Sequence, residues 1–145
     1  MIERVQAEAT RALRAGDRGR VGALRLILAA LQTAAKRDGG ITEGEQLAVL
    51  RRERKQRVEA AETYAAAGRP DRAEGELYEA GVIDEFLPAA LDRDALERLV
   101  DAAVADSGAT GMRDMGRVMA LVAERSGGAA DPTAAAGLAR ARLGG

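Results

Sequence analysis

The chain has 145 residues, which allows one domain or two small ones, and 47% of them are hydrophobic, with alanine supplying about half of that share. The sequence contains no Cys and no His, which excludes disulfides, thiol nucleophiles, imidazole bases and the usual zinc sites. The net charge of −1 hides an asymmetry, because residues 1–69 hold 14 Lys and Arg against 9 Asp and Glu, whereas residues 70–145 hold 8 against 14. This division favours a polyanion-binding face in the first half.

Two further features of the composition narrow the class of protein. Aromatic residues make up 2% of the chain, which disfavours a base-stacking platform for single-stranded nucleic acid. No uncharged run approaches the roughly 20 residues that span a bilayer, and the first residues carry a charge every few positions. We therefore expect a cytoplasmic protein without a membrane segment.

Apolar residues at steps of three and four predict four helices in the first half of the chain. These helices are expected over residues 2–15, 17–36, 42–67 and 70–88. The third begins at a capping box of Thr42 and Glu45, in which each residue binds an amide of the other. Pro88 ends the fourth. Leu13 and Leu77 belong to the apolar stripes that are expected to face the core.

Three shorter helices are predicted in the second half, where glycines are frequent between them. They are expected from Asp92 to Gly108, from Gly111 to Gly127, and after the capping residue Asp131. No stretch alternates with period two, so the predicted fold class is all-α. The segment FLPAALD around Pro88 is the expected boundary between a four-helix N-terminal domain at 1–88 and a small three-helix C-terminal domain at 89–145.

The densest charge lies in RRERKQR at positions 51–57, which contains five cations in seven residues. On a helix, Arg51, Arg52 and Lys55 fall within an arc of about 100° beside the apolar stripe, where they can bind phosphates. The alternative is that these side chains are solvated or paired with nearby carboxylates. Arg54 falls in the middle of the stripe and Arg57 at its edge. Each must be ion-paired, extend its charge to water, or mark an opening toward a partner.

Catalytic groups are scarce. Carboxylate pairs such as Glu76 with Glu79 can act as acid and base or hold Mg²⁺. No second motif converges on them, and a solvated helix face is the favoured interpretation. Ser107 and Ser126 are explained by their positions at predicted helix ends. We therefore expect no catalytic residue, no metal and no cofactor.

Four segments taken in order resemble the GatB/YqeY family. They are AGDRGRVGALRLILAALQ, LRRERKQRVEAAETYAAAGRPDRAEGE, the FLP at 86–88, and GATGMRDMGRVMALV followed by GGAAD. The resemblance covers nearly the whole chain. It implies an all-helical protein with four helices before three, similar to the tail of the B subunit of the amidotransferase that amidates Glu-tRNA(Gln) or Asp-tRNA(Asn). That tail helps to engage tRNA and is not the catalytic part.

The resemblance also supplies candidate site residues. Positions 55–57 match the family's KQR, positions 68 and 69 the turn after it, and positions 114–119 the DMGxVM motif. The candidate nucleic-acid-binding residues are Arg51, Arg52, Lys55, Arg57 and Arg69, and the other family-motif residues are Gln56, Gly68, Asp114, Met115, Gly116 and Met119.

The chain departs from the family pattern in two places. Ala129 and Thr133 stand where the family often has cations, which weakens the case for tRNA contact through the C-terminal domain. Arg54 stands where an apolar residue is more usual.

Three functions remain open at this stage. The first is a non-catalytic module that binds tRNA or another RNA, with a salt-dependent affinity. The second is a protein-interaction or adaptor module that binds a partner or a second copy of itself without nucleic acid. The third is an enzyme related to carbon–nitrogen ligases that use glutamine as amide donor. It is the least supported, because the kinase-like and amidase parts of such a ligase have no counterpart in this sequence.

Overall fold

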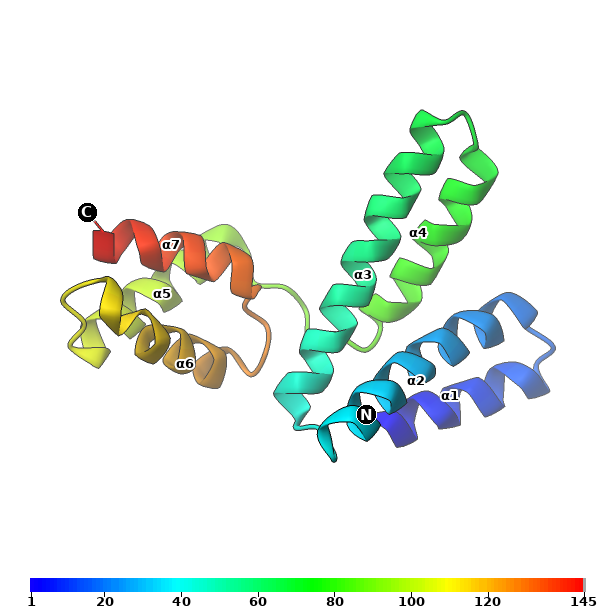
Figure 1. The fold of residues 1–145 in the computed structure, drawn as a ribbon, viewed down its shortest axis with the longest axis horizontal. Helices are drawn as coiled ribbons and strands as arrows, with labels where there is room; N and C mark the ends of the chain where they lie inside the picture. The colour runs from blue at the N-terminus through cyan, green and yellow to red at the C-terminus, as the bar shows by residue number, and fades with distance from the viewer. Residues whose placement is uncertain (145) are drawn as a thin grey trace. The chain divides into compact units, whose positions relative to one another are not determined.

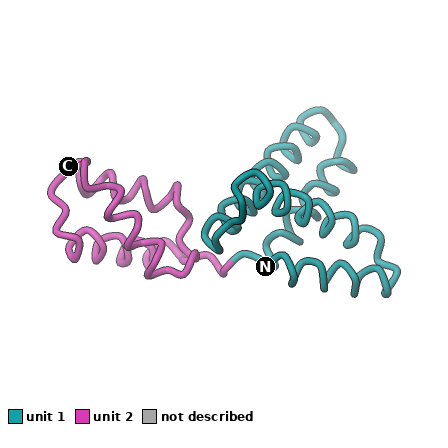
Figure 2. Tube along the Cα trace, turned by 60° about the horizontal axis from the view of Figure 1, so that its bottom comes forward, with its two compact units in different colours: residues 1–87 teal, residues 88–145 magenta. Residues whose placement is uncertain are grey.

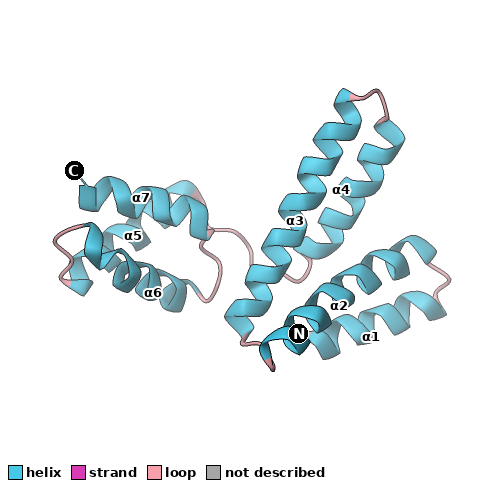
Figure 3. Cartoon of the chain, viewed as in Figure 1, coloured by secondary structure: helices cyan, strands magenta, loops and turns pink. Residues whose placement is uncertain are grey.

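The computed structural model describes residues 1–144, and this part of the chain is all-α (Figures 1 and 3). The seven α-helices and one 3₁₀ helix of these residues are α1 (Ile2–Arg14), α2 (Arg18–Asp38), α3 (Glu43–Ala66), α4 (Pro70–Asp84), α5 (Arg93–Ser107), η1 (Met112–Asp114), α6 (Met115–Ser126) and α7 (Pro132–Gly144). The all-helical expectation is therefore confirmed. No helix within residues 1–144 is both long and apolar enough to cross a membrane.

Capping side chains begin α2, α3, α5 and α7 where the sequence predicts them. The capping box of α3 is present in full: the Glu45 amide donates to Thr42 Oγ1 at 3.2 Å and the Thr42 amide to Glu45 Oε2 at 2.7 Å. Asp17 accepts a hydrogen bond from the first turn of α2, and Asp92 from the first turn of α5. Two expected helix bounds were wrong. The fourth helix ends at Asp84 and not at Pro88, and the sixth begins at Met115, after the tight turn η1 over residues 112–114.

The chain divides into two compact units, residues 1–87 and 88–145 (Figure 2). In the first unit α1 pairs with α2 and α3 with α4, while α2 also contacts both α3 and α4. Its largest fully buried side chains are Leu24 and Leu31 of α2 and Leu50 of α3. Helix α2 therefore joins the two helical pairs into one core.

Two leucines that were expected in the core are exposed. Leu13 keeps 60% of its surface accessible and Leu77 keeps 53%, so both predictions were wrong. The side of α4 that faces the core contains Ala80 and Ile83, as expected, but the half-buried residues beside them are Glu76 and Glu79 and not Leu77. Helical spacing identifies an apolar stripe but not which residues at its edges are buried. In α4 the half-buried positions are those of Glu76 and Glu79, which pair with Arg57 of α3, and Leu77 is left in solvent.

The end of α4 is fastened to α1 and α2. Arg20 binds the Glu85 carboxylate through two nitrogens, at 2.7 and 3.1 Å, and Glu8 at 3.3 Å. This hydrogen bonding lowers the pKa of Glu85. Arg4 donates to the Glu85 carbonyl oxygen and lies 4.8 Å from the ring centroid of Phe86. These contacts fix the FLP segment that ends the first unit.

The second unit has its own small core, formed by α5, α6 and α7. Val100, Val118 and Val122 are its largest fully buried side chains, and alanines fill most of the remainder. Arg142 Nε of α7 lies 2.6 Å from Asp101 Oδ1 of α5, which ties the last helix to the first of this unit.

Candidate nucleic-acid interface

The cations of α3 divide into two groups according to their partners. Arg52 and Lys55 are exposed and lie about one turn apart on the same side of the helix. Lys55 makes only a long contact, 3.9 Å from Glu59 to its ammonium nitrogen, and no carboxylate of residues 1–144 lies within ion-pair distance of Arg52. Arg51 is half-buried beside them. Arg52 and Lys55 are therefore the two predicted residues of α3 that face solvent together without a short ion pair.

Arg54 is exposed and paired, which settles the question raised by its place in the apolar stripe. Its Nε lies 2.5 Å from Asp84 Oδ1 at the end of α4, and the side chain keeps 44% of its surface accessible. The Arg54 guanidinium thus lies at the edge of the α3–α4 pair, bound to a carboxylate and partly in water, and is not buried in the apolar core.

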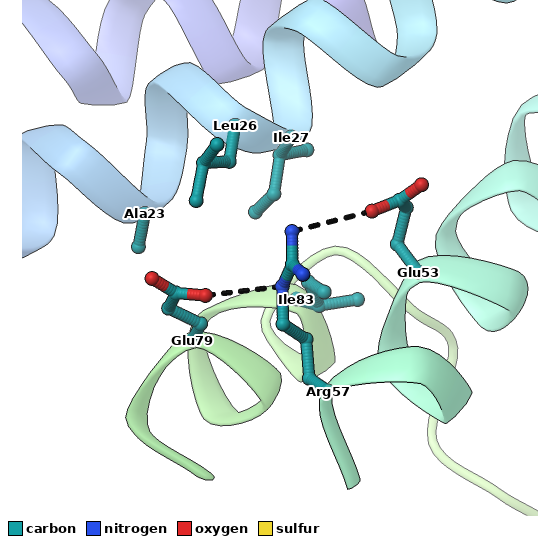
Figure 4. A pocket seen from close by; sticks show the side chains of 7 residues that line it. All are labelled: Ala23, Leu26, Ile27, Glu53, Arg57, Glu79 and Ile83. Carbon is teal, nitrogen blue, oxygen red and sulfur yellow. Dashed lines mark hydrogen bonds and ion pairs between the residues drawn. The ribbon is translucent and has the colours of Figure 1, made fainter. Parts of the chain in front are cut away.

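Arg57 lies at the centre of a half-buried cluster of charges (Figure 4). Its guanidinium is 3.0 Å from Glu79, 3.4 Å from Glu53 and 3.9 Å from Glu76, and its side chain is 22% exposed. Ile27 of α2 lines the same small pocket. Three carboxylates surround one guanidinium, so Arg57 is engaged within the protein and its charge is already compensated.

Burial leaves two carboxylates of this cluster, Glu76 and Glu79, in unfavourable surroundings. One oxygen of Glu76 is fully buried and accepts no hydrogen bond from any residue of the described chain. Burial, opposed by Arg57 and reinforced by the negative charge of Glu76, raises the pKa of Glu79. Residues 1–144 contain no group of three acidic side chains arranged to hold a metal ion.

The turn after α3 is shaped by its glycine. Gly68 has a φ of +74°, in the left-handed region where a side chain would be strained, so this position needs glycine for the chain to turn into α4. Arg69 follows at the N-cap of α4 and is exposed, with Asp71 at 3.7 Å. Gln56 is exposed on α3.

The second family motif, at positions 114–119, has a structural role within the second unit. Asp114 accepts a hydrogen bond from the Thr110 amide at 3.0 Å and from Arg117 at 2.7 Å. The backbone hydrogen bond lowers the pKa of Asp114. Met115 and Met119 pack, partly buried, on the core of the unit.

The remaining motif position, Gly116, and the two positions where the family often has cations, Ala129 and Thr133, are not part of that core. Gly116 is exposed on α6, with nothing within 4 Å of where a Cβ would stand. Ala129 is half-buried, and its carbonyl accepts a hydrogen bond from the Leu91 amide. Thr133 is exposed in the first turn of α7.

Sequence reasoning missed two exposed cations of α2, Arg25 and Lys36. Neither lies within 4.0 Å of a carboxylate of residues 1–144. They are eleven residues apart, which is three helical turns, so they share one edge of the helix. That spacing was visible in the sequence but was not used.

The comparison with known families decides what kind of chain this is. The family model described as Yqey-like protein matches residues 2–143, nearly the whole length. The chain belongs to the Yqey-like protein family. This confirms the resemblance drawn from the segments around KQR, FLP and DMGRVM. No curated protein matches the sequence.

Proposed function

We propose that this Yqey-like protein is a non-catalytic module that binds tRNA or another structured RNA through α3. The observation that carries the proposal is the pair of exposed cations Arg52 and Lys55 on one face, beside Arg51, in the basic half of the chain. Phosphate oxygens are suitable ligands for such a face, because guanidinium and ammonium groups form strong charge-assisted hydrogen bonds with them and binding releases the counterions of the nucleic acid.

Within the proposed interface the five predicted residues have different parts. Arg51, Arg52 and Lys55 form its centre, and Arg69 lies at its periphery beside Asp71. Arg57 has a structural part beside the interface and does not bind phosphate in this proposal, because its charge is already shared among three glutamates. It holds the α3–α4 pair in shape.

We also propose that the two compact units are separate domains, a four-helix domain at 1–88 and a three-helix domain at 89–145. Each has a hydrophobic core of its own. The RNA-binding role is assigned to the first, because the second lacks the family's cations at 129 and 133. We expect the protein to act in the cytoplasm. The family is linked to glutamine-dependent carbon–nitrogen ligases, and we expect this chain not to catalyse their reaction by itself.

The test is fluorescence anisotropy of labelled bulk tRNA titrated with the full chain at low salt. The variant Arg52→Gln/Lys55→Gln is expected to bind at least tenfold more weakly than the unaltered protein. A charge-matched control, Arg113→Gln/Arg140→Gln, removes two exposed cations of the second unit and is expected to change the affinity less than twofold. Absence of binding by the unaltered protein, or equal losses in both variants, would contradict the proposal.

A further inference from the structure

A shallow groove runs between α2 and α3 of the first unit, close to the Arg57 cluster. Its lining consists of Ala29, Ala30, Thr33, Ala34 and Arg37 from α2, with Val49, Arg52 and Glu53 from α3. The Glu53 carboxylate is paired with Arg57 at 3.4 Å. We call it the α2–α3 groove. Its middle is small and apolar, and each helix adds one cation.

The apolar surface continues along α2 beyond the groove. Leu26 lies about one turn before Ala29 and Ala30 and keeps 45% of its surface exposed. In the segment LRLILAAL, Leu24, Ile27 and Leu31 are buried in the core, whereas Leu26 lies outside their arc. Together with Ala29 and Ala30 it forms an apolar patch that α1, α3 and α4 leave open.

Cations border this apolar surface on both sides. Arg25 and Lys36 lie on one edge of α2, about 16 Å apart along the helix, and Arg52 lies across the groove on α3. None of the three is within 4.0 Å of a carboxylate in residues 1–144, whereas Arg20 and Arg54 of the same helices are ion-paired. Arg37 is held by Asp38. The one carboxylate that lines the groove, Glu53, is already paired with Arg57. The cations Arg25, Lys36 and Arg52 therefore leave uncompensated positive charge on both edges of the apolar strip.

We infer that the α2–α3 groove binds an acidic amphipathic helix of a partner protein. A helix with small apolar residues on one side covers the alanines and Leu26, and its flanking carboxylates reach the cations on both edges. The alanines allow the two helix axes to approach closely. The distance from Arg25 to Lys36 fits about three turns of such a helix.

Two other occupants fit less well. A nucleic-acid backbone would place phosphates over Leu26 and the alanines, where they lose hydration that the apolar side chains do not replace. A second copy of this chain, paired through the same surface, would bring cationic edges against cationic edges. Charge complementarity therefore selects an acidic protein helix. This inference is independent of the proposed RNA contact, although Arg52 lies at the border of both surfaces.

Photo-crosslinking identifies the occupant directly. The full chain with Ala29→p-benzoylphenylalanine is irradiated in lysate of the source cells, with the same substitution at the exposed Ala7 of α1 as background. We expect adducts specific to position 29 that map to an acidic helical segment of another protein. Adducts with RNA, with a second copy, or with a basic or non-helical segment would overturn the inference, as would the absence of adducts above background.

A synthetic peptide of the crosslinked segment then tests the charges and the apolar strip separately. Leu26→Glu and Lys36→Glu are each expected to weaken its binding at least tenfold, measured by anisotropy. Both positions are exposed, so the variants should keep the helical signal of the unaltered protein. The control Arg14→Glu, an exposed cation of α1, should stay within twofold. Equal effects of all three would overturn the inference.

Discussion

Replacing Arg57 by methionine should destabilise the first unit more than any other change to the α3 cations. The substitution keeps an unbranched apolar stem but removes the guanidinium, which is the only cation that residues 1–144 place within 4.0 Å of Glu53, Glu76 or Glu79. Removing one partner of a fully buried ion pair costs about 3–5 kcal/mol, whereas an exposed pair contributes about 0–1 kcal/mol. The side chains of this cluster keep 22–29% of their surface exposed, so we expect a loss of about 2 kcal/mol.

Thermal unfolding followed by circular dichroism measures this loss. For a unit of this size, about 2 kcal/mol lowers Tm by roughly 8–16 °C. Arg54→Met is the matched control, because that guanidinium pairs with Asp84 at the surface and should contribute less than about 1 kcal/mol. Neutralising Glu76 and Glu79 to glutamine in the Arg57→Met background should recover part of the loss. A Tm decrease for Arg57→Met no larger than for Arg54→Met would refute the reasoning.

Four further predictions concern two shifted carboxylates, one side-chain to backbone hydrogen bond and one helix cap. The pKa of Glu79 is raised, so ionisation of this carboxyl destabilises the folded protein. Glu79→Gln should therefore have a higher Tm than the unaltered protein as pH rises above about 4.3, and the difference in Tm should vanish in acid. The pKa of Glu85 is lowered, so Glu85→Gln should reduce Tm most at neutral pH. This reduction in Tm should fade as pH drops below about 4.3, and parallel curves of Tm against pH for the two variants would contradict the reasoning. Asp114→Ala should speed hydrogen exchange at the Thr110 amide, detected by NMR, and unchanged exchange would show that this hydrogen bond is dispensable. Thr42→Ala should cost about 1 kcal/mol in urea unfolding, because it removes the hydroxyl that accepts from the Glu45 amide, although the amide of residue 42 can still donate to Glu45; a cost near zero would contradict that role.

The helices could be predicted because their signals are local. Thr42 with Glu45, and Asp92 before α5, act on amides within one turn, so the sequence contains every group involved. Asp131 similarly accepts a hydrogen bond from the first turn of α7. The period of three and four residues identified each helix for the same reason.

The partners of the α3 cations could not be predicted, because they depend on which helix packs against α3. Arg54 and Arg57 lie three residues apart, yet one reaches Asp84 at the surface and the other enters a cluster with Glu79. The error at Leu77 has the same origin, because the rotation of α4 is set by those tertiary contacts. The uncovered side of α2 likewise becomes visible only when its neighbours are placed.

The salt dependence of tRNA binding tests the central claim most directly. Each phosphate contact contributes about 0.7–0.9 to the slope of log affinity against log salt concentration, so loss of Arg52 and Lys55 should make the slope shallower by about 1.4–1.8. We predict this change for Arg52→Gln/Lys55→Gln and an unchanged slope for the second-unit control Arg113→Gln/Arg140→Gln. An affinity that does not respond to salt, or a slope that stays the same without these two cations, would contradict RNA binding through α3.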